Sequence, residues 1–299
     1  MDPECFPICL DLLCHSGYTL SLEKACVIQT SLAVLQNENH FTKIFYWGTI
    51  FGIEGDYYIA FGFRKDLLKG RVFYYSTNAL NWVLLPKPEE SHLNLSLICT
   101  NRFQGDPSFV VEVLDDQPAE KGAEADTAEH AGEDKDTLAG GDAFSLPKDG
   151  KKTSLKEEDR LAAVVKMITR EAALVPRGAF FRHPNGAVVP NQAFRGLTIE
   201  EAPILTNYFH FRMPLTKWEE NVAKRPDYNY STDFLDSIED DLPIKGAWSF
   251  QLVDGKRSVI LRSLTWLGMT FYHNIFTSVH GFAYFGIGKK NLDVPFMLN

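Results

Sequence analysis

A histidine and a run of carboxylates are the side chains best suited to chemistry in this sequence. His210 lies in an aromatic segment, and four carboxylates follow it at Asp236, Glu239, Asp240 and Asp241. General acid–base catalysis requires such groups to occupy enclosed environments that separate their pKa values. A charged helix end is more often a solvated surface. An enzyme with an unrecognised site near these residues is therefore the alternative to a non-catalytic protein.

The N-terminal cysteines form a second candidate site. Cys5, Cys9, Cys14 and His15 could in principle ligate zinc, but their spacing differs from that of zinc motifs and no second pair follows. The sequence contains five cysteines, an odd number, which favours reduced thiols that pack as small hydrophobic groups. We therefore predict no metal site here.

Residues 286–290, Gly-Ile-Gly-Lys-Lys, resemble part of a phosphate-binding loop. They lack the earlier glycine and the Ser or Thr after the lysine that would hold magnesium. The sequence also has no Gly-x-Ser-x-Gly, His-Glu-x-x-His or Cys-x-x-Cys motif. His273, like His210, is interpreted as a partly buried structural histidine. We therefore predict no catalytic, cofactor-binding or metal-binding residues and no small-molecule ligand.

The composition indicates a folded protein whose charge is unevenly distributed. The chain has 299 residues, 45% of them hydrophobic, and a formal net charge of −9. Residues 115–142 carry ten acidic side chains and two lysines, so the rest of the chain is nearly neutral. A nucleic-acid-binding protein would present a basic surface, and no apolar run is long enough to cross a membrane. We expect no nucleic-acid or membrane partner and, because a signal peptide is lacking, a cytoplasmic location.

The N-terminal half is predicted to contain helices followed by strands. Residues 4–37 favour helices, and Ser21 is a suitable cap for the second of them. Alternating apolar residues predict strands at 43–52, 56–63, 71–75, 81–85, 93–100 and 108–114. Bulky aromatic residues on both sides of these strands indicate either a sheet covered on both faces or a face that contacts another subunit.

The acidic residues 115–153 interrupt this pattern and contain too little apolar surface to fold, so they are predicted to be a disordered insert. A helix is predicted to begin at Ser154, because Ser154 and Glu157 fit a capping box. The apolar stripe of that helix is Leu161, Val164, Val165 and Ile168.

The remaining C-terminal residues are predicted to form a hairpin at 177–189, short helices at 198–211 and 234–242, and strands at 266–273 and 282–288. Asp254-Gly255 predicts a two-residue hairpin turn that places Phe250 opposite Val259. The expected fold is α+β, with N-terminal helices and antiparallel β-sheets in both halves. We expect three segments, 1–114, 115–153 and 154–299, of which the first and last pack as one body.

Several longer motifs resemble the radial spoke head protein family of motile cilia. They occur in order along both halves, at residues 47–52, 56–60, 102–108, 175–180, 208–212, 259–266 and 290–298. One is Trp-Gly-Thr-Ile-Phe-Gly, and another is Lys-Asn-Leu-Asp-Val-Pro-Phe-Met-Leu. None is a short generic motif, so the resemblance is specific.

The resemblance implies a structural subunit of the radial spoke head in the axoneme of cilia or flagella. Its expected role is to support assembly of the spoke head and to transmit signals from the central pair to the dyneins. The implied partners are other radial spoke head and stalk proteins and, indirectly, the central pair apparatus. The family supplies no catalytic residues, and the implied location is the cytoskeleton of the cilium.

Overall fold

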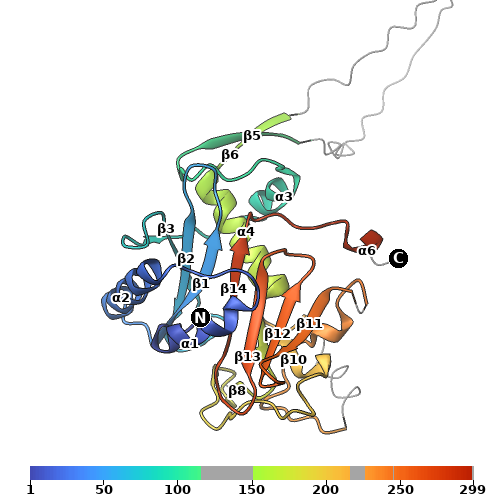
Figure 1. Cartoon of the computed structure of the whole chain (residues 1–299). Coiled ribbons are helices and arrows are strands. Elements are labelled where there is room, and N and C mark those ends of the chain that lie inside the picture. Colours follow the sequence, from blue (N-terminus) through green and yellow to red (C-terminus); the bar gives the residue numbers. More distant parts are fainter. Residues whose placement is uncertain (116–150, 216–225, 245, 298–299) are drawn as a thin grey trace, which may run out of the picture.

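A computed structural model describes residues 1–115, 151–215, 226–244 and 246–297 (Figure 1). The predicted disordered insert at 115–153 falls largely on residues 116–150, which lie outside the described residues. None of the helices in the described ranges is long and apolar enough to cross a bilayer.

An eight-stranded sheet forms the centre of the fold, in the order β11-β12-β13-β14-β1-β2-β3-β4. Its strands are β1 Lys43–Ile50, β2 Tyr57–Phe63, β3 Val72–Ser76, β4 Val83–Leu84, β11 Trp248–Val253, β12 Ser258–Ser263, β13 Met269–Asn274 and β14 His280–Gly286. All neighbours are antiparallel except β1 and β14, which are parallel. The prediction of an α+β fold with antiparallel strands in both halves is confirmed, and the two halves share one sheet.

Smaller elements surround this sheet. Three two-stranded ribbons pair β5 Val110–Asp115 with β6 Lys151–Lys156, β7 Leu174–Pro176 with β10 Tyr208–His210, and β8 Phe180–Arg182 with β9 Val188–Pro190. The α-helices are α1 Phe6–Cys14, α2 Leu22–Glu38, α3 Glu90–Ile98, α4 Glu157–Ala172 and α6 Val294–Met297. Short 3-10 helices lie at η1 Pro3–Cys5, η2 Leu205–Asn207 and η3 Ile238–Asp240.

Helices cover both faces of the sheet, with α1 and α2 on one side and α4 on the other (Figure 1). Strand β2 supplies side chains to both cores. Tyr57, Ile59 and Phe61 join the core beneath α4, whereas Tyr58 and Ala60 join the core beneath α1 and α2. Successive side chains of a strand point to opposite faces, so these bulky strands fit a sheet covered on both sides. That prediction is confirmed for β2.

Helix α2 and the first hairpin also match the sequence predictions. The Ser21 hydroxyl accepts a hydrogen bond from the Lys24 amide at 3.3 Å, and the helix begins at the next residue, Leu22. This bond satisfies one of the backbone N–H groups that the first turn leaves unpaired. Strands β1 and β2 pair as an antiparallel hairpin.

The parallel pairing of β1 with β14 joins the two halves of the chain. Gly48 lies opposite Tyr284 in this register and has a φ of 146°. A Cβ atom at this position would overlap the backbone carbonyl and amide of Tyr284. Only glycine therefore allows the two strands to approach as closely as their hydrogen bonds require.

The strand predicted at 93–100 is wrong, because these residues belong mainly to helix α3. Alternate leucines gave the pattern of a strand, but a short apolar run of this kind does not distinguish a strand from a helix. In the helix, Leu95 and the adjoining Cys99 pack against Val111, Val113 and Leu155 of the β5–β6 ribbon. A tertiary contact has decided the local structure.

The predicted helix start at Ser154 is also wrong. Residues 151–156 form strand β6 opposite β5, and the helix begins at Glu157. This finding also moves residues 151–153 from the predicted insert into a strand. The predicted apolar stripe of α4 is confirmed, because its four members are all buried. Glu157 faces the core rather than capping Ser154.

Two predicted helices in the C-terminal half are wrong in extent. Of residues 198–211, only η2 is helical, and Tyr208–His210 form strand β10 because they pair with β7. Thr198 and Glu201 do form a local capping interaction, with the Thr198 amide donating to the Glu201 carboxylate at 3.1 Å. Of residues 234–242, only η3 is helical.

The hairpin near Asp254 has a longer turn than predicted. Phe250 lies opposite Leu261, and Val253 opposite Ser258, so residues 254–257 form the loop. Asp254, Gly255 and Lys256 all have positive φ angles. The register differs from the predicted one by two residues. Such a shift keeps each side chain on its predicted face, because the strand repeat is two residues.

Candidate functional site

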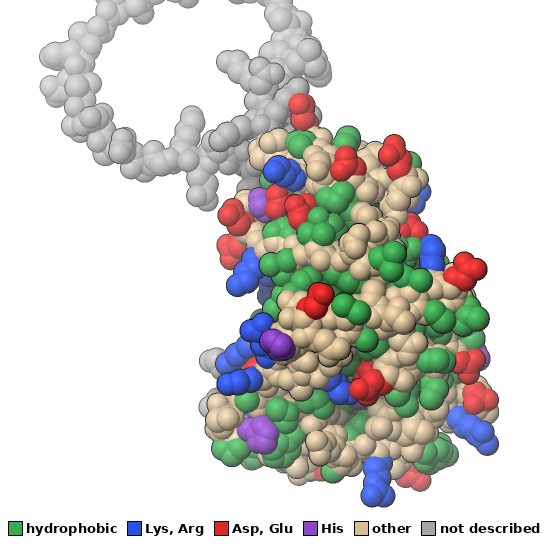
Figure 2. All heavy atoms as spheres, turned by 90° about the vertical axis from the view of Figure 1, so that its left-hand side faces the viewer, with side chains coloured by type: hydrophobic (Ala, Val, Ile, Leu, Met, Phe, Trp, Pro, Cys, Tyr) green, Lys and Arg blue, Asp and Glu red, His purple; other side chains and the backbone are tan. Residues whose placement is uncertain are grey.

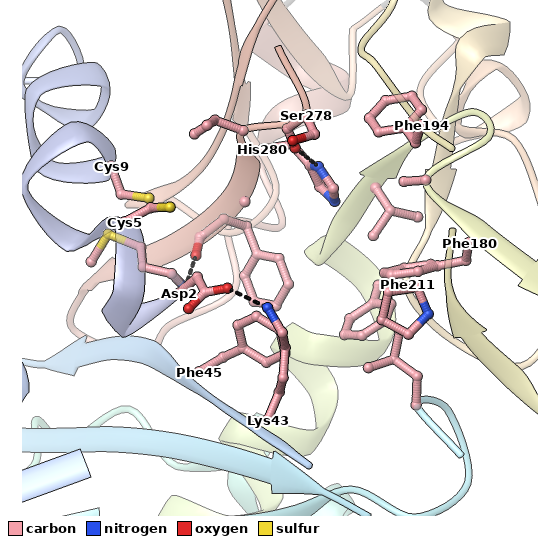
Figure 3. Close-up of a pocket in the computed structure, with 18 of the residues that line it drawn as sticks. Asp2, Cys5, Cys9, Lys43, Phe45, Phe180, Phe194, Phe211, Ser278 and His280 are labelled. Carbon is pink, nitrogen blue, oxygen red and sulfur yellow. Dashed lines mark hydrogen bonds and ion pairs between the residues drawn. The ribbon is translucent and has the colours of Figure 1, made fainter. Parts of the chain in front are cut away.

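A partly open cavity of about 300 Å³ lies between the N-terminal segment, the central sheet and the β7–β9 region (Figure 3). Its wall is mainly aromatic. Six phenylalanines line it: Phe45, Phe61, Phe180, Phe194, Phe211 and Phe282. The volume is at the lower end of the range for ligand sites, and apolar walls with few polar groups are typical of them. We treat this cavity as the candidate functional site.

The N-terminal segment forms one side of the cavity through Asp2, Cys5 and Cys9 (Figure 3). Lys43 of β1 holds this segment, because its ammonium group lies 2.9 Å from the Asp2 carboxylate. Burial raises the pKa of the Cys9 thiol, so the thiol stays protonated and a weak nucleophile. The wall is therefore suited to binding more than to reaction.

His280 is a preorganised polar group on this wall. Its Nδ1 donates a hydrogen bond to the Ser278 carbonyl at 2.8 Å, since a carbonyl oxygen can only accept. Nε2 therefore carries the lone pair and is a hydrogen-bond acceptor. Phe194 and Phe180 meet the ring edge-to-face at 5.6 and 6.3 Å between centroids. These contacts fix the orientation of the ring.

The structure brings several of the residues considered for catalysis together, but outside the cavity. His210 Nε2 lies 2.9 Å from Asp241, and the other oxygen of Asp241 accepts from the Trp248 indole at 2.7 Å. Asp236 accepts from Arg212 at 2.6 Å. These bonds tie β10 to the segment 236–241 and to β11. None of these residues lines the cavity. Their hydrogen bonds connect separate segments of the chain and so have a structural role.

Glu239 and Asp240 are exposed on η3. The N-terminal cysteines are also separated in environment, because Cys9 is buried whereas Cys14 is exposed. Within the described residues, no group of three His, Cys, Asp or Glu side chains is arranged to hold a metal ion.

Residues 286–290 attach the end of β14 to helix α4. The Gly288 amide donates to the Tyr284 hydroxyl at 2.9 Å, and a Cβ at Gly288 would press against the Phe103 ring. Lys290 pairs with Glu171 of α4 at 2.8 Å. The glycines thus permit close packing, and the lysine is engaged in an ion pair.

His273 is fully buried and neutral in the fold. Its Nδ1 donates to the Val279 carbonyl and its Nε2 accepts from the Leu197 amide, both at 3.1 Å. Burial is the main cause that lowers the pKa of His273 to about 4. Both ring nitrogens are used within the fold, as expected for a structural histidine, although His273 is fully buried rather than partly buried as predicted.

This pKa predicts a dependence of stability on pH. The unfolded histidine takes up a proton near pH 6.5, so between pH 6.5 and 4 the unfolded state binds more protons than the folded state. The free energy of unfolding should therefore fall as the pH falls through this window, by up to about 3 kcal/mol from His273. Urea unfolding at several pH values gives the free energy of unfolding as a function of pH. That free energy should fall less between pH 6.5 and 4 in His273→Gln than in the wild type. The exposed His15→Gln serves as a control, and an unchanged slope in H273Q would contradict the assignment.

Large apolar side chains are exposed around the edge of the sheet that contains β4. Val34 of α2, Leu80, Val83 and Leu84 each have about half of their surface exposed, between 48% and 59%. Figure 2 shows hydrophobic side chains spread among polar ones on this side of the molecule. Exposed apolar groups at a sheet edge are common where another chain binds.

Comparison with known proteins gives a match over the whole chain. A family model described as radial spokehead-like protein matches residues 10–148. Radial spoke head protein 9 homologs of Xenopus tropicalis and Danio rerio are each 39% identical to the chain, and that of Homo sapiens is 37% identical. Each alignment covers 100% of this chain and 100% of the relative. The chain belongs to the radial spoke head protein 9 family.

Membership of the radial spoke head protein 9 family confirms the resemblance that the sequence motifs indicated. The cavity itself was not predicted, because its wall combines the N-terminal segment with β1, β14 and the β7–β9 region. One signal in the sequence pointed toward it. Phe45, Tyr46 and Trp47 are consecutive aromatic residues, and Phe45 lines the cavity.

Proposed function

We propose that this chain is a structural subunit of the ciliary radial spoke head, without catalytic activity. The observation that carries the proposal is the full-length similarity to radial spoke head protein 9 homologs at 37–39% identity. Within the family, the chain supports assembly of the spoke head and transmission of central-pair signals to the dyneins. Its place is the axoneme of the cilium or flagellum.

The arrangement of polar groups supports a structural role. Asp236 and Asp241, which could have served as catalytic carboxylates, accept hydrogen bonds from Arg212 and Trp248. Such bonds hold segments of the chain together and leave these carboxylates engaged in the fold. The exposed apolar residues near β4 offer surface for other spoke proteins. The partners we infer are radial spoke head and stalk proteins, with the central pair reached indirectly.

Affinity purification tests this proposal. A tagged chain expressed in ciliated cells should recover other spoke head proteins from salt-extracted axonemes, in a constant ratio over repeated washes. The soluble, axoneme-free fraction of the same cells is the control. Recovery of the chain in that fraction alone, without spoke proteins, would contradict the proposal.

A further inference from the structure

We propose that the aromatic cavity receives a tryptophan side chain from a partner protein, with the indole N–H bound by Nε2 of His280. This inference rests on the proposed function, because it assumes that the chain works within an assembly. The cavity has about 300 Å³ of space, which suits one large side chain or a very small molecule. Its phenylalanine wall offers apolar contact on several sides.

The hydrogen bonding of His280 selects the occupant. Because Nδ1 donates to the Ser278 carbonyl, Nε2 is an acceptor, and it has no hydrogen-bond partner among the described residues. Partial burial of the ring is the main cause that lowers the pKa of His280 to about 4, so the acceptor persists at neutral pH. The ring points into the cavity from the edge formed by β14 (Figure 3). A group that fills the cavity must therefore bring a donor to this nitrogen.

The other polar groups of the wall do not favour a charged ligand. Lys43 is already paired with Asp2 at 2.9 Å. The Asn191 amide nitrogen donates to the Gly178 carbonyl at 2.8 Å, and its oxygen accepts from the Ala193 amide at 3.0 Å. The cavity thus combines apolar walls with an open acceptor at His280 Nε2. An indole, which is a large aromatic group with a single donor and no acceptor, matches both features.

The location of the cavity supports a protein partner as the source of the indole. Its outer rim includes the exposed residues Glu4, Pro190 and Ser278, so a side chain can enter from the surface. Aromatic anchors that fill such pockets contribute much of the binding energy in protein interfaces. The neighbouring surface would then contact the backbone of the partner around its tryptophan.

A ligand pair tests the hydrogen bond directly. N-acetyl-L-tryptophanamide should bind the purified full chain in a calorimetric or NMR titration. The analogue methylated on the indole nitrogen lacks the donor and should bind about 3- to 10-fold more weakly. Equal binding of the two probes, or no binding of either, would overturn the assigned role of His280.

Protein variants locate the site. His280→Phe keeps an aromatic ring beside Phe194 and Phe180 but removes the acceptor, so it should bind both probes equally and weakly. His183→Phe makes the same change at an exposed histidine outside the cavity and should behave like the wild type. Circular dichroism and thermal melting would show that both variants are folded.

The partner is tested with the same variants in axonemal extracts. N-acetyl-L-tryptophanamide in excess should reduce recovery of one spoke protein, and H280F should reduce the same protein several-fold, whereas H183F should not. Donor-dependent probe binding with full recovery of every spoke protein by H280F would overturn the partner as the source of the indole. If the wild type itself recovers no spoke protein, the proposed function fails, and the probe titrations still decide the chemistry of the cavity.

Discussion

Replacement of Glu157 by alanine should destabilise the protein by about 3–5 kcal/mol, since it would leave several buried donors without an acceptor. Glu157 is fully buried at the start of α4. Its carboxylate accepts from the Tyr57 hydroxyl at 2.7 Å and from the backbone amides of Gln104 and Gly105, the latter at 2.8 Å. The side chain thereby connects helix α4, strand β2 and the loop before β5.

Tyr57 shows how strongly this site depends on the carboxylate. Burial raises the pKa of Tyr57, and the bond to Glu157 raises it further, so the hydroxyl remains a proton donor. Without the carboxylate, this buried hydroxyl and two backbone amides would lose their partner. Chemical denaturation of the purified chain, followed by tryptophan fluorescence, would measure the loss.

Glu158→Ala is the matched control for this prediction. Glu158 is the next residue of α4, and it also accepts from a tyrosine, Tyr75, at 3.1 Å. Its side chain is partly exposed, so water can replace the lost acceptor. The expected loss is at most about 1 kcal/mol. Equal effects of E157A and E158A would contradict the account of the buried site.

Replacement of Gly48 by alanine should cost about 4 kcal/mol or more and should separate the two halves of the sheet. The φ angle of 146° is unfavourable for alanine, and the added Cβ would overlap the backbone of Tyr284. Neither strand can yield easily, because β1 and β14 both lie in the middle of the sheet. Hydrogen exchange should show lost protection in β1 and β14 before other strands.

Gly186→Ala separates the backbone cost from the steric cost. Gly186 also has a positive φ, 83°, but nothing lies within 4 Å of an added Cβ. The expected loss is about 1 kcal/mol, from the backbone conformation alone. A loss in G48A no larger than that in G186A would show that close approach of β1 and β14 is not essential.

The sequence predicted those elements whose pattern agrees with their packing. Helix α2 has both a cap and an apolar face, and β2 has bulky residues in both alternating sets, so local and tertiary preferences coincide. The predictions were wrong where local sequence preference and tertiary packing favour different structures. Glu157 fits a capping box with Ser154, but its bonds to Tyr57 and to the 104–105 backbone lie far away in the sequence.

The sequence analysis also did not predict which strands far apart in the chain pair with each other. The residues of β1 and β14 gave no sign that these strands pair in parallel, because the partners Gly48 and Tyr284 are separated by most of the chain. The candidate cavity was not predicted for the same reason, because its wall is formed by residues that are far apart in the sequence. Lys43, Phe180 and His280 come from three separate strands, so periodicity within one element does not indicate that they share a wall.

The most direct test of the structural role is cryo-electron tomography of axonemes from cells that lack this chain. We expect the doublets and dyneins to remain, while density is lost from the spoke head and the ciliary beat is impaired. Re-expression of the chain should restore the missing density. Intact spoke heads with normal beating in the absence of the chain would contradict the proposal that it is a structural subunit of the head.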